Sequence, residues 1–341
     1  MGARTRATRH EHDIPCHLSL LCLQCLGFFC ELRDMNILTI VGPTAAGKTD
    51  LAIEIAERIS GEIISADSRQ IFKYLDIGTA KPSAKQRRKI EFHLIDFVKP
   101  DEDYSCGQFA RDAVQKIEDI RNRNRVPIVC GGTGLYIRAL FHPLHELPQS
   151  DKKTKIRLSR MLDTHGIEYM YKKLQRVDPV WAKKITPQDK QRILRGLEVY
   201  QMTGKSLTTF IGKKKTSVNF HPYYIGLNMP RVQLYEKINQ RFDQMIEKGL
   251  IKEVKMLLAR GFSPKSSALR TIGYKEIIEY LKGLSNLDEA IDKAKRRTRN
   301  YAKRQITWFS KIPGLRWYNP DVSISVGLTS LLDVLDSSCA Y

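Results

Sequence analysis

The sequence predicts an α/β fold in which a mostly parallel sheet is flanked by helices, with an all-helical domain inserted into it. Short apolar, β-branched runs recur along the chain and are followed by polar or glycine-rich loops, which is typical of buried parallel strands. A basic stretch in the middle of the chain has apolar residues at helical spacing instead. The 341 residues are enough for about two domains.

The clearest element is a strand, a loop and a helix at residues 35–60. The run MNILTIV (35–41) predicts a buried strand, and DLAIEIAERIS (50–60) has apolar residues at helical spacing. Between them lies a complete G-x-x-x-x-G-K-T loop, which predicts a P-loop NTPase-like core that binds a di- or triphosphate. Its Thr49 hydroxyl is a candidate Mg²⁺ ligand. The predicted phosphate-binding residues are Gly42, Pro43, Thr44, Ala45, Ala46, Gly47, Lys48 and Thr49.

A second strand, residues 62–66, is followed by Asp67. Because ligands bind at the carboxyl ends of the strands in open α/β sheets, we expect Asp67 to face the same crevice as the phosphate loop. Its carboxylate is a candidate proton acceptor there, but an Asp before a polar turn is as often a helix cap, so both roles stay open. A third strand at 126–130 ends in Gly-Gly-Thr, and a run at 92–96 is a weak candidate for the metal-binding Asp of an ordinary NTPase.

The positive charge is the main indication of a partner. The chain carries 57 Lys and Arg against 37 Asp and Glu, a net charge of +20, which favours an anionic partner, with nucleic acid first. Residues 142–221 hold 17 bases and seven acids and therefore half of that charge. We interpret them as a helical insertion with a basic face that contacts phosphates rather than a merely solvated surface. Gly196 would cost about 1 kcal/mol inside one of its helices.

The last third of the chain returns to the core. Residues 223–227 predict another strand, and helices are predicted at 231–260, 274–281 and 288–309. The final helix ends in a stretch, 293–309, with seven bases and no acid. We expect Trp308 to be buried and Lys303 and Arg304 to face RNA. The predicted domains are an extension (1–34), a core (35–141 and 222–315), the insertion (142–221) and a tail (316–341).

The first 34 residues superficially resemble a signal peptide, but they contain early acids and no small-residue cleavage site. Cys22, Cys25 and Cys30 lack a fourth zinc ligand at the usual spacing. We expect the extension to be disordered, or to precede a natural start at Met35. Seven scattered cysteines, and no apolar run of about 18 residues, favour a reducing, cytoplasmic setting without a membrane span.

Several stretches, taken in order, resemble the tRNA dimethylallyltransferase (tRNA isopentenyltransferase) family of bacterial type. They cover about residues 36–312 and are GPTAAGKT, SADSRQIFKYLDIGTAKP, HLIDFVKPDEDYSCGQF, VPIVCGGTGLYIRAL, DKQRILRGLEVYQMTGKSL, RTIGYKEIIEYL and KRQITWF. The resemblance implies transfer of a dimethylallyl group from dimethylallyl diphosphate to N6 of adenosine-37, beside the anticodon, in tRNAs that read codons beginning with U. It also implies that the loop holds this diphosphate with Mg²⁺, whereas ATP binding rests on the motif alone.

The resemblance assigns roles to individual residues. Asp67 matches the family's general base, Thr133 lies beside the reacting centre and Arg241 lies near the diphosphate; without it, Thr133 would be a turn hydroxyl and Arg241 a solvated helix residue. We add the hypothesis that Gln70 reads the edge of a flipped adenine. The residues implied to contact tRNA are Asp67, Ser68, Arg69, Gln70, Thr133, Lys155, Gln191, Arg192, Ile193, Leu194, Arg195, Arg270, Thr271, Ile272, Gly273, Tyr274, Lys275, Lys303, Arg304 and Gln305.

Three other functions stay open at this point. They are a kinase of adenylate-kinase type, a basic P-loop RNA-binding protein without catalysis, and a prenyltransferase that acts on free AMP. The strong positive charge disfavours the first and the last, because small substrates do not require it. The expected partners are the tRNA anticodon stem-loop and dimethylallyl diphosphate, and we expect a monomer with no membrane contact and no obligate protein partner.

Overall fold

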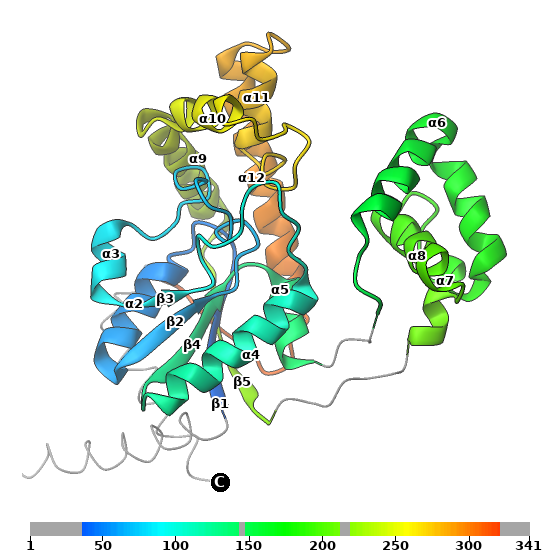
Figure 1. The fold of residues 1–341 in the computed structure, drawn as a ribbon. Helices are drawn as coiled ribbons and strands as arrows, with labels where there is room; N and C mark the ends of the chain where they lie inside the picture. Colours follow the sequence, from blue (N-terminus) through cyan, green and yellow to red (C-terminus); the bar gives the residue numbers. More distant parts are fainter. Residues whose placement is uncertain (1–35, 143–146, 212–218, 321–341) are drawn as a thin grey trace, which may run out of the picture. The chain divides into compact units, whose positions relative to one another are not determined.

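The computed structural model describes residues 36–142, 147–211 and 219–320 (Figure 1). The chain divides into two compact units, a sheet-containing core and a helical unit formed by residues 141–218. Residues 1–35 and 321–341 lie outside the described residues, as do the expectations about the extension and its cysteines. No helix among the described residues is long and apolar enough to cross a membrane.

The core unit contains a six-stranded parallel sheet of order β3-β2-β4-β1-β5-β6. This confirms the predicted α/β class. One boundary was wrong, because residues 316–318, which we assigned to the tail, form an edge strand that pairs with β5 at Ile225↔Arg316. The strands are β1 (Asn36–Val41), β2 (Gly61–Ser65), β3 (Phe92–His93), β4 (Val126–Gly131), β5 (His221–Leu227) and β6 (Arg316–Tyr318).

The sheet is buried at its centre because its middle strands are apolar on both faces. β4 is buried along its whole length, and β1 is buried from its second residue onwards. Leu38 lies opposite Ile128, and Ile40 lies opposite Cys130. These side chains pack with the apolar face of α2 (Lys48–Ile59), whereas α4 (Cys106–Asn122) crosses in front of the sheet (Figure 1). The carboxyl ends of β1, β2 and β4 therefore open onto one edge.

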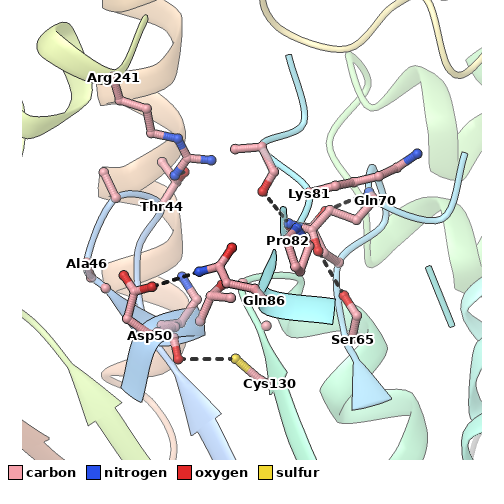
Figure 2. Close-up of a pocket in the computed structure, with 18 of the residues that line it drawn as sticks. Thr44, Ala46, Asp50, Ser65, Gln70, Lys81, Pro82, Gln86, Cys130 and Arg241 are labelled. Atoms are coloured by element: carbon pink, nitrogen blue, oxygen red, sulfur yellow. Dashed lines mark hydrogen bonds between the residues drawn. The ribbon is translucent and has the colours of Figure 1, made fainter. Parts of the chain in front are cut away.

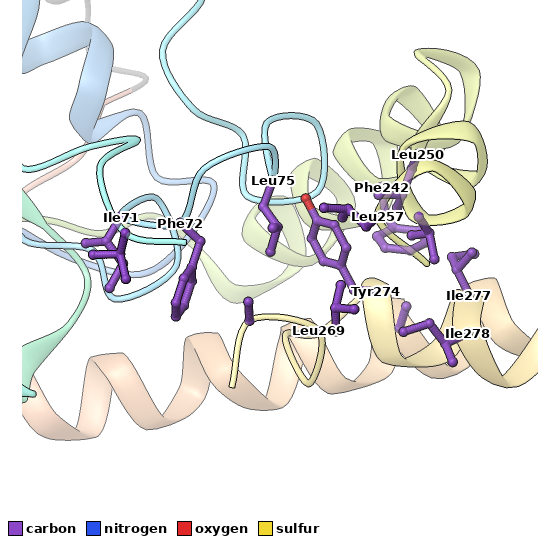
Figure 3. Close-up of a cluster of buried hydrophobic side chains, with 14 residues drawn as sticks. Ile71, Phe72, Leu75, Phe242, Leu250, Leu257, Leu269, Tyr274, Ile277 and Ile278 are labelled. Atoms are coloured by element: carbon purple, nitrogen blue, oxygen red, sulfur yellow. The ribbon is translucent and has the colours of Figure 1, made fainter. Parts of the chain in front are cut away.

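The remaining helices of the core include one correction. The predicted helix 231–260 is two helices, because Gly249 has a φ of 99° and ends the first of them. A second apolar cluster packs the two helices against α11 and the loop that carries Leu75. Figure 3 shows Tyr274 pointing from α11 toward this loop. The helices are α3 (Ala84–Lys89), α5 (Gly134–Phe141), α9 (Arg231–Glu247), α10 (Leu250–Ala259), α11 (Tyr274–Leu281) and α12 (Leu287–Phe309).

The helical unit has a small core of its own, in which Leu158, Met170 and Ile193 are buried. Gly196 is explained by packing, since a Cβ at this position would lie 2.7 Å from the Leu174 side chain. The glycine therefore permits the helices that carry Gly196 and Leu174 to approach closely, and this contact explains why a residue of low helix propensity occupies the position. The elements are α6 (Lys152–Val177), with a kink at Gly166, α7 (Pro179–Lys183), α8 (Lys190–Thr203) and a short 3₁₀ helix (Leu207–Phe210).

Candidate active site

The phosphate loop joins β1 to α2 and depends on glycine at two positions. Gly42 has a φ of 146°, and a Cβ here would lie 2.4 Å from the carbonyl oxygen of Leu227 on β5. Gly47 has a φ of 83° and directly precedes the helix. L side chains rarely adopt these conformations, so the two glycines allow the loop to turn its N–H groups toward the start of α2.

Two cations face this loop. The Lys48 side chain is buried and its Nζ donates to the carbonyl oxygen of Pro43 at 2.7 Å. Burial lowers the pKa of Lys48 to about 8, and the nearby Arg241 acts in the same direction. Arg241 extends from α9 and its Nη1 lies 3.4 Å from Thr44 Oγ1 (Figure 2). The fold thus brings Arg241 to the phosphate loop from 197 residues beyond Thr44 in the sequence.

Asp67 follows β2, and its geometry is compatible with both roles that its sequence context left open. Its Oδ1 accepts the backbone N–H of Arg69 at 2.8 Å and that of Gln70 at 3.4 Å, so this oxygen caps the local turn. No hydrogen bond from the described residues reaches Oδ2. One oxygen therefore fixes the orientation of the carboxylate, and the other remains able to accept a proton.

Thr133 follows β4 and contacts the Asp67 turn. Its Oγ1 accepts the backbone N–H of Ser68 at 3.0 Å and lies 3.3 Å from Ser68 Oγ. The partner is 65 residues away, so this hydroxyl is not engaged in a merely local turn. The tips of the neighbouring strands β2 and β4 are joined through it.

One cavity connects the phosphate loop, its two cations and Asp67, whereas Thr133 contacts the Asp67 turn and is not part of the cavity lining. The cavity has a volume of about 1140 Å³, and its walls include Lys48, Thr49, Asp67 and Arg241. Cys130 also lines it, and burial raises the pKa of this thiol to about 12, so Cys130 stays protonated at neutral pH. The cavity is large enough for more than a five-carbon diphosphate, since sites for drug-sized ligands typically occupy about 300–1,000 Å³.

A wall that sequence reasoning missed is formed by residues 76–87. Its anchor is Lys81, whose buried Nζ donates to the carbonyl oxygen of Phe72 and to the carboxylates of Asp76 and Asp96, all at 2.6–2.7 Å. Asp96 is therefore an ion-pair partner of Lys81 rather than the metal-binding Asp of an NTPase. Residues 76–82 belong to a stretch that carries the family resemblance, but neither that resemblance nor any periodicity assigned them to a cavity wall.

Gln70 lies in the same wall, and its amide is used within the protein. Its Oε1 accepts a hydrogen bond from Ser65 Oγ at 3.1 Å, and its Nε2 donates to the carbonyl oxygens of Ala80 at 3.2 Å and Thr79 at 3.4 Å (Figure 2). An amide with both ends engaged does not present a free edge to a base. The hypothesis that Gln70 reads adenine therefore needs correction: here Gln70 holds the wall in place.

Two groups of residues offer donor atoms of the kind that bind metal ions. Thr49 lines the cavity beside Asp50, whose Oδ1 accepts a hydrogen bond from Gln86 at 3.0 Å, so hard oxygen donors lie at the phosphate loop as Mg²⁺ requires. Glu62 and His93 form a second cluster with Glu91 outside the cavity lining. There Glu62 Oε2 accepts hydrogen bonds from His93 at 2.7 Å and from Arg123 at 2.6 Å, so this carboxylate is already neutralised by a cation.

The predicted RNA contacts of the helical unit are of two kinds. Lys155, Gln191 and Arg192 are exposed. Ile193 belongs to the core of the unit, and Arg195 pairs with the buried Glu198 at 2.7 Å. The expectation that the Ile193 side chain contacts RNA is therefore wrong, because this side chain is buried in the core of the helical unit. Leu194 is half-buried against the same core.

The predicted contacts in the core unit also divide. Arg270, Lys303 and Arg304 are exposed, and Ile272 and Lys275 are partly exposed. Thr271, Gly273 and Gln305 are buried, and Tyr274 is fully buried with its hydroxyl donating to Glu253 at 2.6 Å. Direct RNA contact through the Tyr274 side chain is corrected, since its hydroxyl is bound inside the core, and Gln305 is engaged by two internal hydrogen bonds. Thr271 is also buried, but its Oγ1 has no hydrogen-bond partner among the described residues. Trp308, which we expected to be buried, is 41% exposed.

Known proteins share this arrangement. The family models for IPP transferase and isopentenyl transferase match residues 70–312 and 35–100. A tRNA dimethylallyltransferase of Acetivibrio thermocellus is 46% identical over 84% of this chain and 92% of its own length, and one of Thermoanaerobacter sp. (strain X514) is 44% identical with the same coverage. The chain belongs to the tRNA dimethylallyltransferase family.

Solved structures agree with this membership. The tRNA isopentenylpyrophosphate transferase of Bacillus halodurans is 37% identical, with a TM-score of 0.66, and the match covers 89% of this chain and 96% of that one. A eukaryotic dimethylallyltransferase acting on tRNA is 29% identical, with a TM-score of 0.71, over 84% and 74% of the two chains. The overall fold of this chain is thus shared with solved tRNA isopentenyltransferase structures.

Proposed function

We propose that this protein transfers a dimethylallyl group from dimethylallyl diphosphate to N6 of adenosine-37 in tRNA. The products are N6-dimethylallyladenosine and diphosphate. The observation that carries the proposal is that Lys48 of the phosphate loop and Asp67 line one cavity. A diphosphate bound by the loop would therefore have its prenyl carbon in the same cavity as a carboxylate that can accept a proton.

The loop side of the cavity suits the leaving group. Negative charge develops on the diphosphate as its bond to the allylic carbon breaks, and fixed donors aimed at that charge stabilise the transition state. Lys48, Arg241 and the N–H groups at the start of α2 provide such donors. Thr49 would hold Mg²⁺, which supplies further neutralisation of the diphosphate when it is bound.

The opposite side suits the nucleophile. N6 forms its bond to the allylic carbon and loses a proton, which Asp67 accepts on Oδ2. The Arg69 N–H holds Oδ1 at 2.8 Å, so the carboxylate needs no reorientation during this step. Thr133, at the end of β4, holds the Asp67 turn in place by accepting the Ser68 N–H.

The acceptor is proposed to be an anticodon loop adenosine in tRNAs that read codons beginning with U. A stacked base must be extruded to reach an enclosed carboxylate, at a cost of a few kcal/mol, roughly the energy of unstacking one base. The net charge of +20 supports a polyanionic acceptor, because phosphate contacts can offset that cost. We infer a monomer that works in the cytoplasm, where its tRNA substrates are.

The test supplies purified protein with labelled dimethylallyl diphosphate, Mg²⁺ and unmodified tRNA, with AMP as a parallel acceptor. Label should enter tRNA but not AMP. Asp67→Asn keeps an acceptor for the Arg69 N–H but removes the base, so turnover should fall by about 10²–10⁴-fold. Asp119→Asn, on the exposed side of α4, is the matched control and should retain full activity.

Two results would contradict the proposal. Label in AMP alone would assign a free nucleotide as acceptor. Full transfer by Asp67→Asn would remove the carboxylate from the chemistry, and phosphoryl transfer from ATP to a nucleotide in the same preparation would indicate a kinase instead.

A further inference from the structure

Gln305 lies on α12 between the phosphate loop and the end of β4. Its side chain is buried, with 6% of the residue exposed. Its Nε2 donates to the carbonyl oxygen of Gly132 at 2.8 Å, and its Oε1 accepts the backbone N–H of Thr44 at 2.8 Å. One amide therefore connects the loops that follow β4 and β1, two neighbouring strands of the sheet.

The glycines around Thr133 provide independent support for this contact. A Cβ on Gly132 would lie 2.2 Å from Gln305 Nε2, and a Cβ on Gly134 would lie 2.2 Å from the Trp308 ring. Gln305 and Trp308 are three residues apart and so lie on the same face of α12. The helix thus packs against both residues that flank Thr133, at positions where a larger side chain would not fit.

We propose that Gln305 is a positioning residue for prenyl transfer, which sets the spacing between the phosphate loop and Thr133. The inference rests on the proposed function, in which the loop holds the leaving diphosphate and Thr133 holds the turn that carries the base Asp67. The amide also occupies the Thr44 N–H, so the diphosphate is bound by other donors of the loop. Because a displacement of about 1 Å at a reacting centre can cost 10²-fold in rate, the separation of these two loops matters directly to turnover.

The family resemblance suggested a different role for Gln305, a direct contact with tRNA. Its amide is buried and bonded at both ends to backbone of the core, which favours a role inside the protein over a direct contact with tRNA. The neighbouring Lys303 and Arg304 are exposed on the same helix and remain suited to that contact. The two roles predict different changes: positioning affects kcat, whereas RNA contact affects the affinity for tRNA.

The experiment compares Gln305→Leu and Gln305→Glu with wild type. Leu removes both hydrogen bonds, and Glu keeps an acceptor for Thr44 but loses the donor to Gly132. Both variants should lower kcat at least 30-fold while the dissociation constant of tRNA stays within twofold. Lys303→Gln is the comparator for an RNA contact and should instead weaken tRNA binding. Thermal unfolding identifies which variants are folded. If one of the two substitutions prevents folding, the other still tests the proposal.

A double-mutant cycle separates positioning from general packing. If Gln305 acts through Thr133, Gln305→Leu should lower kcat much less in a Thr133→Ala background than in wild type. Losses that multiply independently would overturn the inference, as would folded variants with kcat within threefold of wild type or with weaker tRNA binding and normal kcat. Failure of the proposed function is distinct, because it would appear as no transfer by the wild-type protein.

Discussion

The side-chain hydroxyl of Thr133 accepts a hydrogen bond from the backbone N–H of Ser68 at 3.0 Å. This bond joins the ends of β2 and β4, and it holds the residue next to Asp67 in place. The carboxylate that we propose as the base is therefore oriented from two sides, by its own Arg69 cap and by the hydroxyl of a different strand.

Thr133→Val tests this bond, because it preserves the shape of the side chain but removes the acceptor. The Ser68 N–H would lose its partner, and the Asp67 turn would be less well held. We expect kcat to fall by about 10–100-fold, the cost of misplacing a catalytic group by a fraction of an ångström. Thr133→Ser keeps the hydroxyl and should retain most of the activity. Equal losses in both variants, measured by steady-state transfer to tRNA, would argue against the hydrogen bond.

Lys48 predicts a specific pH dependence. Burial lowers its pKa to about 8 in the free protein, so the ammonium loses its proton as the pH rises through 8. The affinity for diphosphate should then fall by roughly tenfold per pH unit above 8, as one proton is linked to binding. Lys48→Arg keeps its charge and should show a flatter profile in calorimetric titrations from pH 7 to 9.5. The same decline in both proteins would exclude Lys48 as the titrating group.

The same residue has the opposite effect on folding. A buried ammonium is unfavourable, and the unfolded chain binds the Lys48 proton more tightly than the folded one. Its cost to stability is therefore fully present below pH 8 and is relieved between pH 8 and the unfolded pKa of 10.5. Denaturant unfolding of wild type and Lys48→Met should converge over that interval, and a constant difference would contradict the assignment.

A cationic cluster on α9 and α12 predicts a salt-dependent RNA contact. Arg231, Arg299 and Lys303 each lie within 6 Å of the ring of Tyr235, and among the described residues none of the three has a carboxylate partner. Replacing one of them by Gln should reduce the slope of log affinity for tRNA against log salt by about 0.7–0.9 if it neutralises a phosphate. Lys295→Gln is the control, since Lys295 already pairs with Asp243 at 2.6 Å. Equal changes in slope for a cluster variant and for the control would contradict a phosphate contact by the cluster.

Glu253 supports the start of the cavity wall from behind, and its replacement should have a large effect on stability. Its buried carboxylate accepts the backbone N–H groups of Asp76, Ile77 and Gly78 and the hydroxyl of Tyr274. Glu253→Gln should lower the free energy of unfolding by about 2–3 kcal/mol, because hydrogen bonds to a charged acceptor are lost. Tyr274→Phe removes one of these bonds and should cost about 1 kcal/mol. A loss below 0.5 kcal/mol in urea unfolding of Glu253→Gln, roughly that of a neutral surface change, would show that solvent replaces these bonds.

Much of the site was predictable because local patterns encode local geometry. The strand, the glycine loop and Lys48 are contiguous, and each follows from backbone conformation or helix potential within a few residues. Asp67 was recognisable as a strand-end carboxylate but not as a base, since a cap and a base have the same local sequence. Arg241 lacked any local signal and was found through the family resemblance.

Other features could not be derived from periodicity. Trp308 fits a helical stripe, yet it is partly exposed because it lies over Gly134 rather than within a helix–helix core. Three of the seven bases in residues 293–309 form ion pairs with acids on other helices, Lys293 with Glu279, Lys295 with Asp243 and Arg297 with Glu276, so the charge run overstated the surface available to RNA.

The amino-acid sequence by itself determined the α/β class, the phosphate loop and a basic helical stretch, because each depends on the order and spacing of neighbouring residues; the prenyl-transfer chemistry entered through the family resemblance. The tertiary structure alone decided which distant groups meet at the cavity: Arg241 at Thr44, Thr133 at Ser68 and Gln305 between Thr44 and Gly132. These contacts depend on how helices pack against strand ends, and that packing is set by the shape and burial of the whole core rather than by any local pattern.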